Sequence, residues 1–543
     1  MSASSVGRHR GLLLLVPFAV AVALRIYPYL VYGVPYSTDS WSPIRNTQEL
    51  LAHTPTTLGG NHVFDGYNIY WPANSLFGAV ASLVLNVAPI KIMPLLFPLI
   101  GASTVVIFFL VAERVTGSPV VASMAALFLA ASGFDAIFTA GVTKETYALP
   151  LFMLSMLLLL WKTDWKSGTL FAIASVTMAL SHHATAVVFL AVAASILFVD
   201  SILLKRRGEP IGKKPLLFVI GAAITLIDIV VYSGAGLTQF GTQGFLTLQN
   251  VILALAFLAV FVTPIAYHSL SRPTKVLFAE GALVLGLALA VLAIGTRAAV
   301  IPLAPTVTST LLVSAVPYAL LGILAIFGYR VMHLAKERRN FVFLASWLAS
   351  VLAFGFLALF SSVPDGLALI ARLLTFIAPP ALILASLALQ KALGRAGQRG
   401  ALKVLVVLVI LGIAIPSAFQ TYQASIQKES LLGGQWAYQP SDLVGAQWIS
   451  ASSGTGYVAV AGDTRMQHIL TDYLGVNVDV VAGYLYLANP HQIVRPEYLV
   501  TYSLMKTNGY VLFLYGMPLP DDWAITLQKN SPLVYSNGNF VVW

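Results

Sequence analysis

The first apolar run of the chain is GLLLLVPFAVAVALRIYPYLV at residues 11–31, directly after the basic residues Arg8 and Arg10. A transmembrane helix needs about 20 predominantly apolar residues, so this run is long enough to cross a bilayer. It resembles a signal peptide, but it is longer than a signal-peptide core and no small-residue cleavage site follows it. We therefore expect a retained first helix.

The composition of the whole chain is also that of a membrane protein. Of its 543 residues, 58% are hydrophobic and only 10% are charged, with a mean hydropathy of +0.84. Soluble domains carry roughly 25% charge, so a soluble enzyme is excluded. Most of the chain lacks the alternation of a membrane β-barrel, which leaves helices. The absence of cysteine excludes disulfides, thiolate metal sites and thiol nucleophiles.

Further apolar runs extend this pattern over most of the chain. Together they predict thirteen spans, at about 11–31, 92–112, 118–135, 146–161, 168–181, 184–203, 215–232, 247–266, 275–294, 308–328, 340–360, 373–390 and 402–418. The apolar stretch from Asn74 to Ala88 is shorter and ends at Pro89, so it predicts a re-entrant or interfacial helix. The fold expected for residues 1–420 is a polytopic all-α membrane domain of about thirteen transmembrane helices.

The basic residues define an orientation. The formal net charge of +10 raises nucleic acid as a partner, but the loops on the side of the N-terminus hold 20 of the 31 basic residues. This distribution follows the positive-inside rule. We therefore expect a multi-pass protein of the cell (cytoplasmic) membrane with a cytoplasmic N-terminus, an extracytoplasmic C-terminus and no nucleic-acid partner.

The first outer loop, at about residues 33–72, is the most informative segment: GVPYSTDSWSPIRNTQELLAHTPTTLGGNHVFDGYNIYWP. Asp39 lies just after the first helix, where a carboxylate could act as a base or a metal ligand on a substrate partly in lipid. Ser42 to His53, with Pro43 in its first turn, predicts a short interfacial helix. The alternative is a solvated loop in which Asp39 caps that helix. Asp65 and the aromatic Trp41 belong to the same loop.

The second outer loop and a histidine pair supply further polar residues. The loop FDAIFTAGVTKETYALP carries Asp135, Lys144 and Glu145. Glu145 in a helical first turn is favourable without any function. His182 and His183 lie between two short spans, where buried imidazoles are costly unless they pair or bind something. A structural role for either histidine alone is the alternative.

Two outer arginines complete the candidate site. Arg372, near the start of a late span, and Arg297, in GTRAAVIPLAP, suit a lipid phosphate, or they extend to lipid headgroups without a function. The spans themselves contain Arg25, Asp228 and Glu280. These would be the working charges of a transporter or lipid flippase, or they mark polar packing between helices.

The segment 421–543 changes character and predicts a small soluble extracytoplasmic α/β domain. Alternating runs such as YVAVAG and EYLVTY predict strands, and LVYSNGNFVVW predicts a hairpin at Asn537-Gly538. Asp442 to Ser450 predicts a helix, and GDTR at 462–465 a loop after a strand. No nucleotide-binding glycine motif is present. The domain is expected to contact an acceptor or to cover the membrane site.

These features together resemble the GT-C superfamily of integral-membrane glycosyltransferases. The resemblance rests on the acid after the first helix, the acidic second outer loop, the late outer arginine and the outward C-terminal domain. Thirteen helices with such a domain are most similar to oligosaccharyltransferase catalytic subunits, and protein O-mannosyltransferases and aminoarabinose transferases share the first-loop acid. The tail lacks a WWDYG motif, and Asp39-Ser40-Trp41 is not a DxD pair. A transferase using a simple polyprenyl-phosphate sugar fits better than one acting on Asn.

The resemblance implies a polyprenyl-phosphate sugar donor, membrane lipids as surroundings, and a glycan, lipid or protein acceptor. It implies Asp39 as the base, with Glu145 or Asp135 orienting the acceptor or joining Asp39 on Mg or Mn. Arg372, with Lys144, His182 or His183, would stabilise the leaving group. Arg297, Asp65 and Trp41 are further substrate-binding candidates. A transporter or flippase and a non-catalytic relative remain the alternatives.

Overall fold

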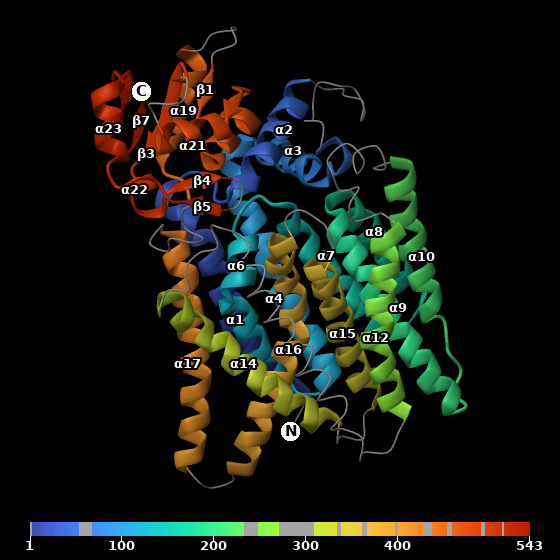
Figure 1. The fold of residues 1–543 in the computed structure, drawn as a ribbon. Helices are drawn as coiled ribbons and strands as arrows, with labels where there is room; N and C mark the ends of the chain where they lie inside the picture. Colours follow the sequence, from blue (N-terminus) through green and yellow to red (C-terminus); the bar gives the residue numbers. More distant parts are fainter. Residues whose placement is uncertain are drawn as a thin grey trace.

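The computed structural model describes residues 3–53, 68–161, 163–232, 248–270, 309–333, 338–360, 366–396, 400–426, 437–452, 459–489, 495–512 and 515–543. Figure 1 shows a bundle of long helices with a small mixed domain, formed by the C-terminal residues, at one end. The N-terminus lies at the opposite end of the bundle (Figure 1).

The bundle helices follow the predicted spans along the chain. They are α1 (Ala3–Tyr32), α4 (Pro89–Thr116), α5 (Pro119–Ala131), α6 (Gly133–Thr139), α7 (Lys144–Leu160), α8 (Trp165–Ser181), α9 (His183–Arg206), α10 (Lys214–Ile227), α12 (Leu248–Leu270), α14 (Ser309–His333), α15 (Arg338–Phe360), α16 (Gly366–Ala396) and α17 (Gly400–Ser425). A π-helical turn, η3 (Asp228–Tyr232), continues α10. Helix overlaps each predicted span that falls on described residues, and the span 275–294 lies outside them.

Seven of the described helices are long and apolar enough to cross a membrane by length and composition. The mostly helical, multi-pass character expected from the sequence is therefore confirmed for the described residues, while the total of thirteen spans stays a prediction. The end of α17 at Ser425 lies a few residues beyond the boundary predicted at 420.

The first outer loop forms a helical layer on the end of the bundle. It contains η1 (Thr38–Ser40), α2 (Trp41–Ala52), η2 (Asn68–Tyr70) and α3 (Ala73–Leu85). The short helix predicted after Pro43 is confirmed, and α3 corresponds to the segment predicted as re-entrant or interfacial; it ends at Asn86 in the left-handed conformation. The alternative in which Asp39 caps α2 is wrong, because Ser40 occupies the N-cap and makes no side-chain capping bond.

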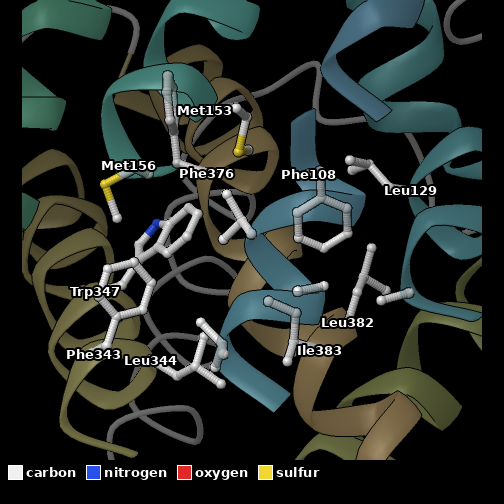
Figure 2. Packing of buried hydrophobic residues seen from close by; sticks show 14 of the residues in the cluster. Phe108, Leu129, Met153, Met156, Phe343, Leu344, Trp347, Phe376, Leu382 and Ile383 are labelled. Carbon is white, nitrogen blue, oxygen red and sulfur yellow. The ribbon is translucent and has the colours of Figure 1, made fainter. Parts of the chain in front are cut away.

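The bundle core is a continuous apolar cluster that joins early and late helices. Figure 2 shows Phe108 of α4 and Leu129 of α5 close to Leu382 and Ile383 of α16. Phe152 of α7 joins this cluster to α15, because its ring lies 5.7 Å from the Trp347 ring, centroid to centroid. Close packing of this kind makes interiors rigid. The apolar cluster therefore fixes the positions of the helix ends from which the outer loops extend.

The C-terminal domain has the predicted α/β character. Its strands are β1 (Val460–Ala461), β2 (Val478–Asp479), β3 (Tyr498–Tyr502), β4 (Tyr510–Leu512), β5 (Tyr515–Met517), β6 (Tyr535–Ser536) and β7 (Phe540–Val542). Its helices are α19 (Pro440–Ser452), α20 (Thr464–Gln467), η6 (His468–Tyr473), α21 (Val480–Ala488), α22 (Met505–Asn508) and α23 (Trp523–Asn530).

The sheet of this domain has the order β2-β1-β3-β7-β6, with β1 parallel to β2 and β3 and with β7 antiparallel to β3 and β6. A second sheet pairs β4 with β5. The predicted helix at 442–450 and the hairpin at Asn537-Gly538 are confirmed by α19 and by the β6–β7 pair. Gly538 has φ +92°, which favours glycine at this turn.

The predicted loop at 462–465 proves to be part of the domain core. Asp463 caps α20 by accepting from the Met466 backbone N–H at 3.0 Å. The Arg465 side chain is 1% exposed and forms an ion pair with Asp442 at 2.5 Å. Its guanidinium lies 4.6 Å and 4.5 Å from the ring centroids of Tyr438 and Tyr502. This buried arginine is paired and stacked, as a buried charge must be.

The domain is docked on the first outer loop through α2 and η6. The fully buried Trp41 ring lies 5.2 Å from the Tyr438 ring and 5.3 Å from the Tyr473 ring, centroid to centroid. Arg45 Nη1 donates to the Thr471 carbonyl at 3.2 Å. The loop and the domain therefore share one core, and whatever fixes η6 also fixes the segment around Asp39.

Gly328 tests the close packing of α14 on α16. A Cβ atom at Gly328 would lie 1.7 Å from the Leu384 carbonyl oxygen, whereas one at Gly322 of the same helix meets nothing within 4 Å. Since overpacking typically costs about 1–3 kcal/mol, we expect Gly328→Ala to lower the thermal unfolding midpoint in detergent. Gly322→Ala is the matched control and should leave the midpoint unchanged or raise it; equal effects of the two would contradict this packing.

Candidate active site

The two outer loops meet in a tight backbone contact next to Asp39. Ser37 has φ +80°, a left-handed conformation that is unusual for a serine, and its side chain accepts from the Asp39 backbone N–H at 3.2 Å. Ser40 Oγ accepts from the Val142 N–H at 2.8 Å. A Cβ atom at Gly141 would lie 2.6 Å from the Tyr36 carbonyl oxygen. This strained contact fixes Asp39 relative to the second outer loop.

The start of α7 presents the second acid. Thr143 is its N-cap and accepts from the Thr146 N–H at 3.1 Å, and the Thr143 carbonyl accepts from Asn74 Nδ2 at 2.9 Å. Lys144 and Glu145 therefore occupy the first turn, as predicted. A carboxylate is favoured there by the helix dipole.

Arg372 of α16 joins the two acids. Its Nη2 atom lies 3.6 Å from Asp39 Oδ2, and its Nη1 atom lies 3.5 Å from Glu145 Oε1. These distances are those of ion pairs rather than of short hydrogen bonds. Three residues predicted from separate parts of the sequence are thus brought together by the fold.

The histidine pair lies behind Glu145. His182 Nε2 is 3.6 Å from Glu145 Oε1, and its Nδ1 atom is 2.7 Å from Thr185 Oγ1. The His183 ring lies 5.7 Å from the His182 ring and 4.4 Å from the Trp71 ring, centroid to centroid. Lys144 Nζ lies 4.9 Å from the centroid of the same Trp71 ring. Lys144, His182 and His183 therefore belong to the cluster around Glu145.

The cluster has an open end and a buried end. The side chains of Asp39 and Arg372 are 39% and 44% exposed, whereas those of Glu145 and His182 are 8% and 7% exposed. The open end offers a carboxylate for a proton and a guanidinium for an anion. The buried end holds the guanidinium in place through Glu145.

Asp135 is not part of this cluster. Its carboxylate accepts from Arg25 Nη2 inside the bundle, and Arg25 Nε donates to Thr139 Oγ1 at 2.7 Å. Both charged residues are almost fully buried, at 0% for Arg25 and 2% for Asp135. The interpretation of Asp135 as a second catalytic acid is corrected by this contact, since the carboxylate neutralises a buried arginine. The contact also gives the intramembrane Arg25 a structural partner.

Of the three remaining candidates, only Trp41 is among the described residues, and it does not join the cluster. Trp41 is fully buried between the first outer loop and the C-terminal domain, so it offers no surface to a sugar. This corrects its interpretation as a substrate-binding residue. Arg297 and Asp65 lie outside the described residues.

The C-terminal domain contributes a pair that the sequence analysis did not identify. His468 Nδ1 lies 2.6 Å from Asp472 Oδ2, and both residues belong to η6, which contacts η1 beside Asp39. Burial acts to lower the pKa of His468, but the hydrogen bond and the charges of Asp472, Asp39 and Asp463 raise it above its ordinary value of 6.5. The spacing of His468 and Asp472 by four residues was the available signal.

The resemblance left open whether Asp39, with Glu145 or Asp135, shares a divalent ion, and the described side chains are not arranged as such a ligand set. Arg372 lies between Asp39 and Glu145, and Asp135 is bound to Arg25. Within the described part of the chain, no group of three or more His, Cys, Asp or Glu side chains is placed to share an ion.

Solved structures with the same fold were found by comparison. The chain matches the archaeal oligosaccharyltransferase AglB from Archaeoglobus fulgidus, in complex with an inhibitory peptide and a dolichol-phosphate, over 92% of this chain and 70% of that one, with 12% identity and a TM-score of 0.59. It matches ArnT from Cupriavidus metallidurans bound to undecaprenyl phosphate over 100% and 98%, with 12% identity and a TM-score of 0.50. No family model and no curated protein sequence matches the chain. The chain therefore shares the fold of an oligosaccharyltransferase and of ArnT, which agrees with the fold that the resemblance in the sequence implies.

The Arg25–Asp135 pair predicts a structural, not a catalytic, response to mutation. Asp135→Leu leaves a buried guanidinium without its counter-charge, which typically costs about 3–5 kcal/mol, so the unfolding midpoint should fall sharply. The double variant Arg25→Leu/Asp135→Leu removes both charges and should recover most of that loss. A double variant no more stable than Asp135→Leu, measured by thermal unfolding in detergent, would contradict the assigned role.

Proposed function

We propose that this chain is a membrane glycosyltransferase that moves a sugar from a polyprenyl-phosphate-linked donor to an acceptor on the extracytoplasmic face. The observation that carries the proposal is the position of Arg372 between Asp39 and Glu145, at 3.6 Å and 3.5 Å. A base and an anion-binding group are thereby adjacent at the open end of one cluster. Transfer from a lipid phosphate requires these two groups.

Asp39 is the proposed general base. Its carboxylate takes the proton of the acceptor hydroxyl while the acceptor oxygen forms a bond to the anomeric carbon of the donor sugar. The bond between that carbon and the phosphate oxygen breaks, and its electron pair leaves with the lipid phosphate. The products are the glycosylated acceptor and the polyprenyl phosphate. The exposed fraction of Asp39 allows an acceptor to reach it.

Arg372 is the proposed group that stabilises the leaving phosphate. Its ion pairs with Asp39 and Glu145 are longer than short hydrogen bonds, so a phosphate oxygen can replace Asp39 as its partner at small cost. Glu145, which holds Arg372 and faces His182, is then a positioning residue rather than a second base. Lys144, stacked on Trp71, adds a second positive charge behind the phosphate.

The donor class is supported by the fold neighbours. One of them was solved with a dolichol-phosphate and the other with undecaprenyl phosphate, and both of these are polyprenyl-type lipid phosphates. The absence of a nucleotide-binding glycine motif in this sequence points the same way. The acceptor then approaches beneath the C-terminal domain, where His468 and Asp472 lie next to the Asp39 segment.

Replacing Asp39 tests the assignment of the base. In purified protein, Asp39→Asn should lower sugar transfer from a radiolabelled polyprenyl-phosphate donor by roughly 10²–10⁴-fold, because general base catalysis is lost. Binding of the unlabelled polyprenyl phosphate, followed by thermal shift, should persist because Arg372 remains. Glu49→Gln, which alters an acid on α2 of the same loop, is the matched control and should transfer at the wild-type rate. Undiminished transfer by Asp39→Asn would remove Asp39 from the mechanism.

A transporter or flippase predicts a different pattern. Its working charges would be Arg25, Asp228 and Glu280; of these, Arg25 is bound to Asp135 and Glu280 lies outside the described residues. Lipid or solute flux in proteoliposomes that is unaffected by Asp39→Asn but lost in Asp228→Asn would favour transport over transfer.

The His468–Asp472 pair predicts a pH dependence of stability. Because the pKa of His468 is raised in the folded protein, its protonated form stabilises the fold fully below pH 6.5, and this contribution is lost as the pH rises above 6.5 through the raised value. The unfolding midpoint of the wild type should therefore fall over that range relative to His468→Gln. Asp472→Asn removes the partner that raises the pKa of His468, so the unfolding midpoint of this variant should also fall less than that of the wild type over the same pH range. Parallel pH curves for wild type and His468→Gln would contradict the coupling.

A further inference from the structure

A cavity of about 280 Å³ lies at the end of the bundle opposite the C-terminal domain. It is formed where the last turns of α4 and α7 and the second half of α9 meet the first turns of α10 and α15. It lies far from Asp39 along the bundle axis, and no step proposed above uses it. By the charge distribution of the sequence, this end is the cytoplasmic one.

The polar wall of the cavity is cationic. Arg114, Lys214 and Arg339 line it together with a single carboxylate, Asp200. Arg339 Nη2 and Nε donate to the same Asp200 oxygen, Oδ2, at 2.6 Å and 3.2 Å. The cations therefore exceed the carboxylate by two charges, since three cations face one acid. Such an excess in a recess of the protein attracts an anion.

Two of these cations occupy positions that a helix alone disfavours. Lys214 is the first residue of α10, and Arg339 lies in the first turn of α15. The positive end of the helix dipole is unfavourable for a cation and favourable for an anion. An anion in the cavity would be held by these two side chains, by Arg114 and by the two helix ends at once.

Asp200 indicates that the ligand also carries a hydrogen-bond donor. The residue is only 7% exposed, and its second oxygen, Oδ1, is buried without a hydrogen-bond partner among the described residues. A buried carboxylate oxygen in this state is costly. A ligand that brings a hydroxyl as well as a phosphate would satisfy it.

The rest of the wall is apolar. Leu159, Leu160, Ile196 and Phe343 line the cavity beside the charged groups. A free inorganic anion would leave this surface against water, whereas the glycerol carbons of a lipid headgroup would cover it. The volume suits a headgroup and not a whole lipid, so the acyl chains would remain in the bilayer.

We propose that this cavity binds the headgroup of an anionic phospholipid that carries a hydroxyl, of the phosphatidylglycerol type. The phosphate pairs with Arg114, Lys214 and Arg339, and the headgroup hydroxyl donates to Asp200 Oδ1. The cytoplasmic leaflet, where anionic lipids attract basic segments, is the expected source. This binding does not depend on the transferase activity.

The experiment follows binding by the thermal unfolding of the full-length protein in a neutral detergent. Short-chain phosphatidylglycerol should raise the unfolding midpoint in a saturable way, since a ligand of the folded state stabilises it, and short-chain phosphatidylcholine should not. Lys214→Gln and Arg114→Gln should each raise the half-saturating concentration about tenfold through the lost charge-assisted bond. Lys205→Gln removes an exposed cation from the same end of the bundle that does not line the cavity, and it should bind like the wild type.

Two further arms separate the sources and test Asp200. Free glycerol phosphate that binds as tightly as the lipid would keep the anion site but overturn a lipid as its occupant. The wild type should bind phosphatidylglycerol at a lower half-saturating concentration than phosphatidic acid, which has no headgroup hydroxyl. Asp200→Asn should reduce this difference, because the charged acceptor for the hydroxyl is gone. The proposal would be overturned if neither phosphatidylglycerol nor glycerol phosphate gave a saturable shift of the unfolding midpoint. It would also be overturned if Lys205→Gln weakened binding as much as Lys214→Gln or Arg114→Gln.

Discussion

A charge inside an apolar helical bundle must find a counter-charge, and this constraint organises the whole membrane part of the molecule. Arg25 and Asp135 satisfy it deep in the bundle, where both side chains are almost fully buried. Arg372 satisfies it differently, by sharing two carboxylates at 3.5–3.6 Å while 44% of its side chain stays exposed. The first pair is closed and structural. The second is open, and an open ion pair is one that a substrate can enter.

The open pair depends on parts of the chain that do not touch a substrate. Helices α7 and α16, which carry Glu145 and Arg372, are packed through one apolar core (Figure 2). The first outer loop is then held to the second by the bond between Ser40 and Val142 and by the absence of a side chain at Gly141. On its other side, Trp41 fastens the loop to the C-terminal domain. Asp39 is therefore positioned from two directions.

Hydropathy and charge made most of this arrangement predictable. The helical spans follow from the apolar runs. The position of Asp39, Glu145, His182 and Arg372 at one end of the bundle follows from where polar residues interrupt those runs, because helix ends on one side of a membrane share a plane. Hydropathy places a residue along a helix but not around it, so it did not reveal that Asp135 turns inward to Arg25. Hydropathy also could not predict that Trp41 packs on Tyr438 or that His468 lies near Asp39, because these contacts join segments far apart in the sequence.

The two proposed phosphate sites, one at each end of the bundle, differ in their charge balance. At the outer end, Arg372 is offset by Asp39 and Glu145, so the phosphate of the proposed donor would bind by exchange and could leave again. At the other end, three cations face only Asp200, so the proposed anion would neutralise an excess of positive charge and stay. Exchangeable binding suits a leaving group that must depart after each transfer. Persistent binding suits a lipid that anchors the bundle in its leaflet.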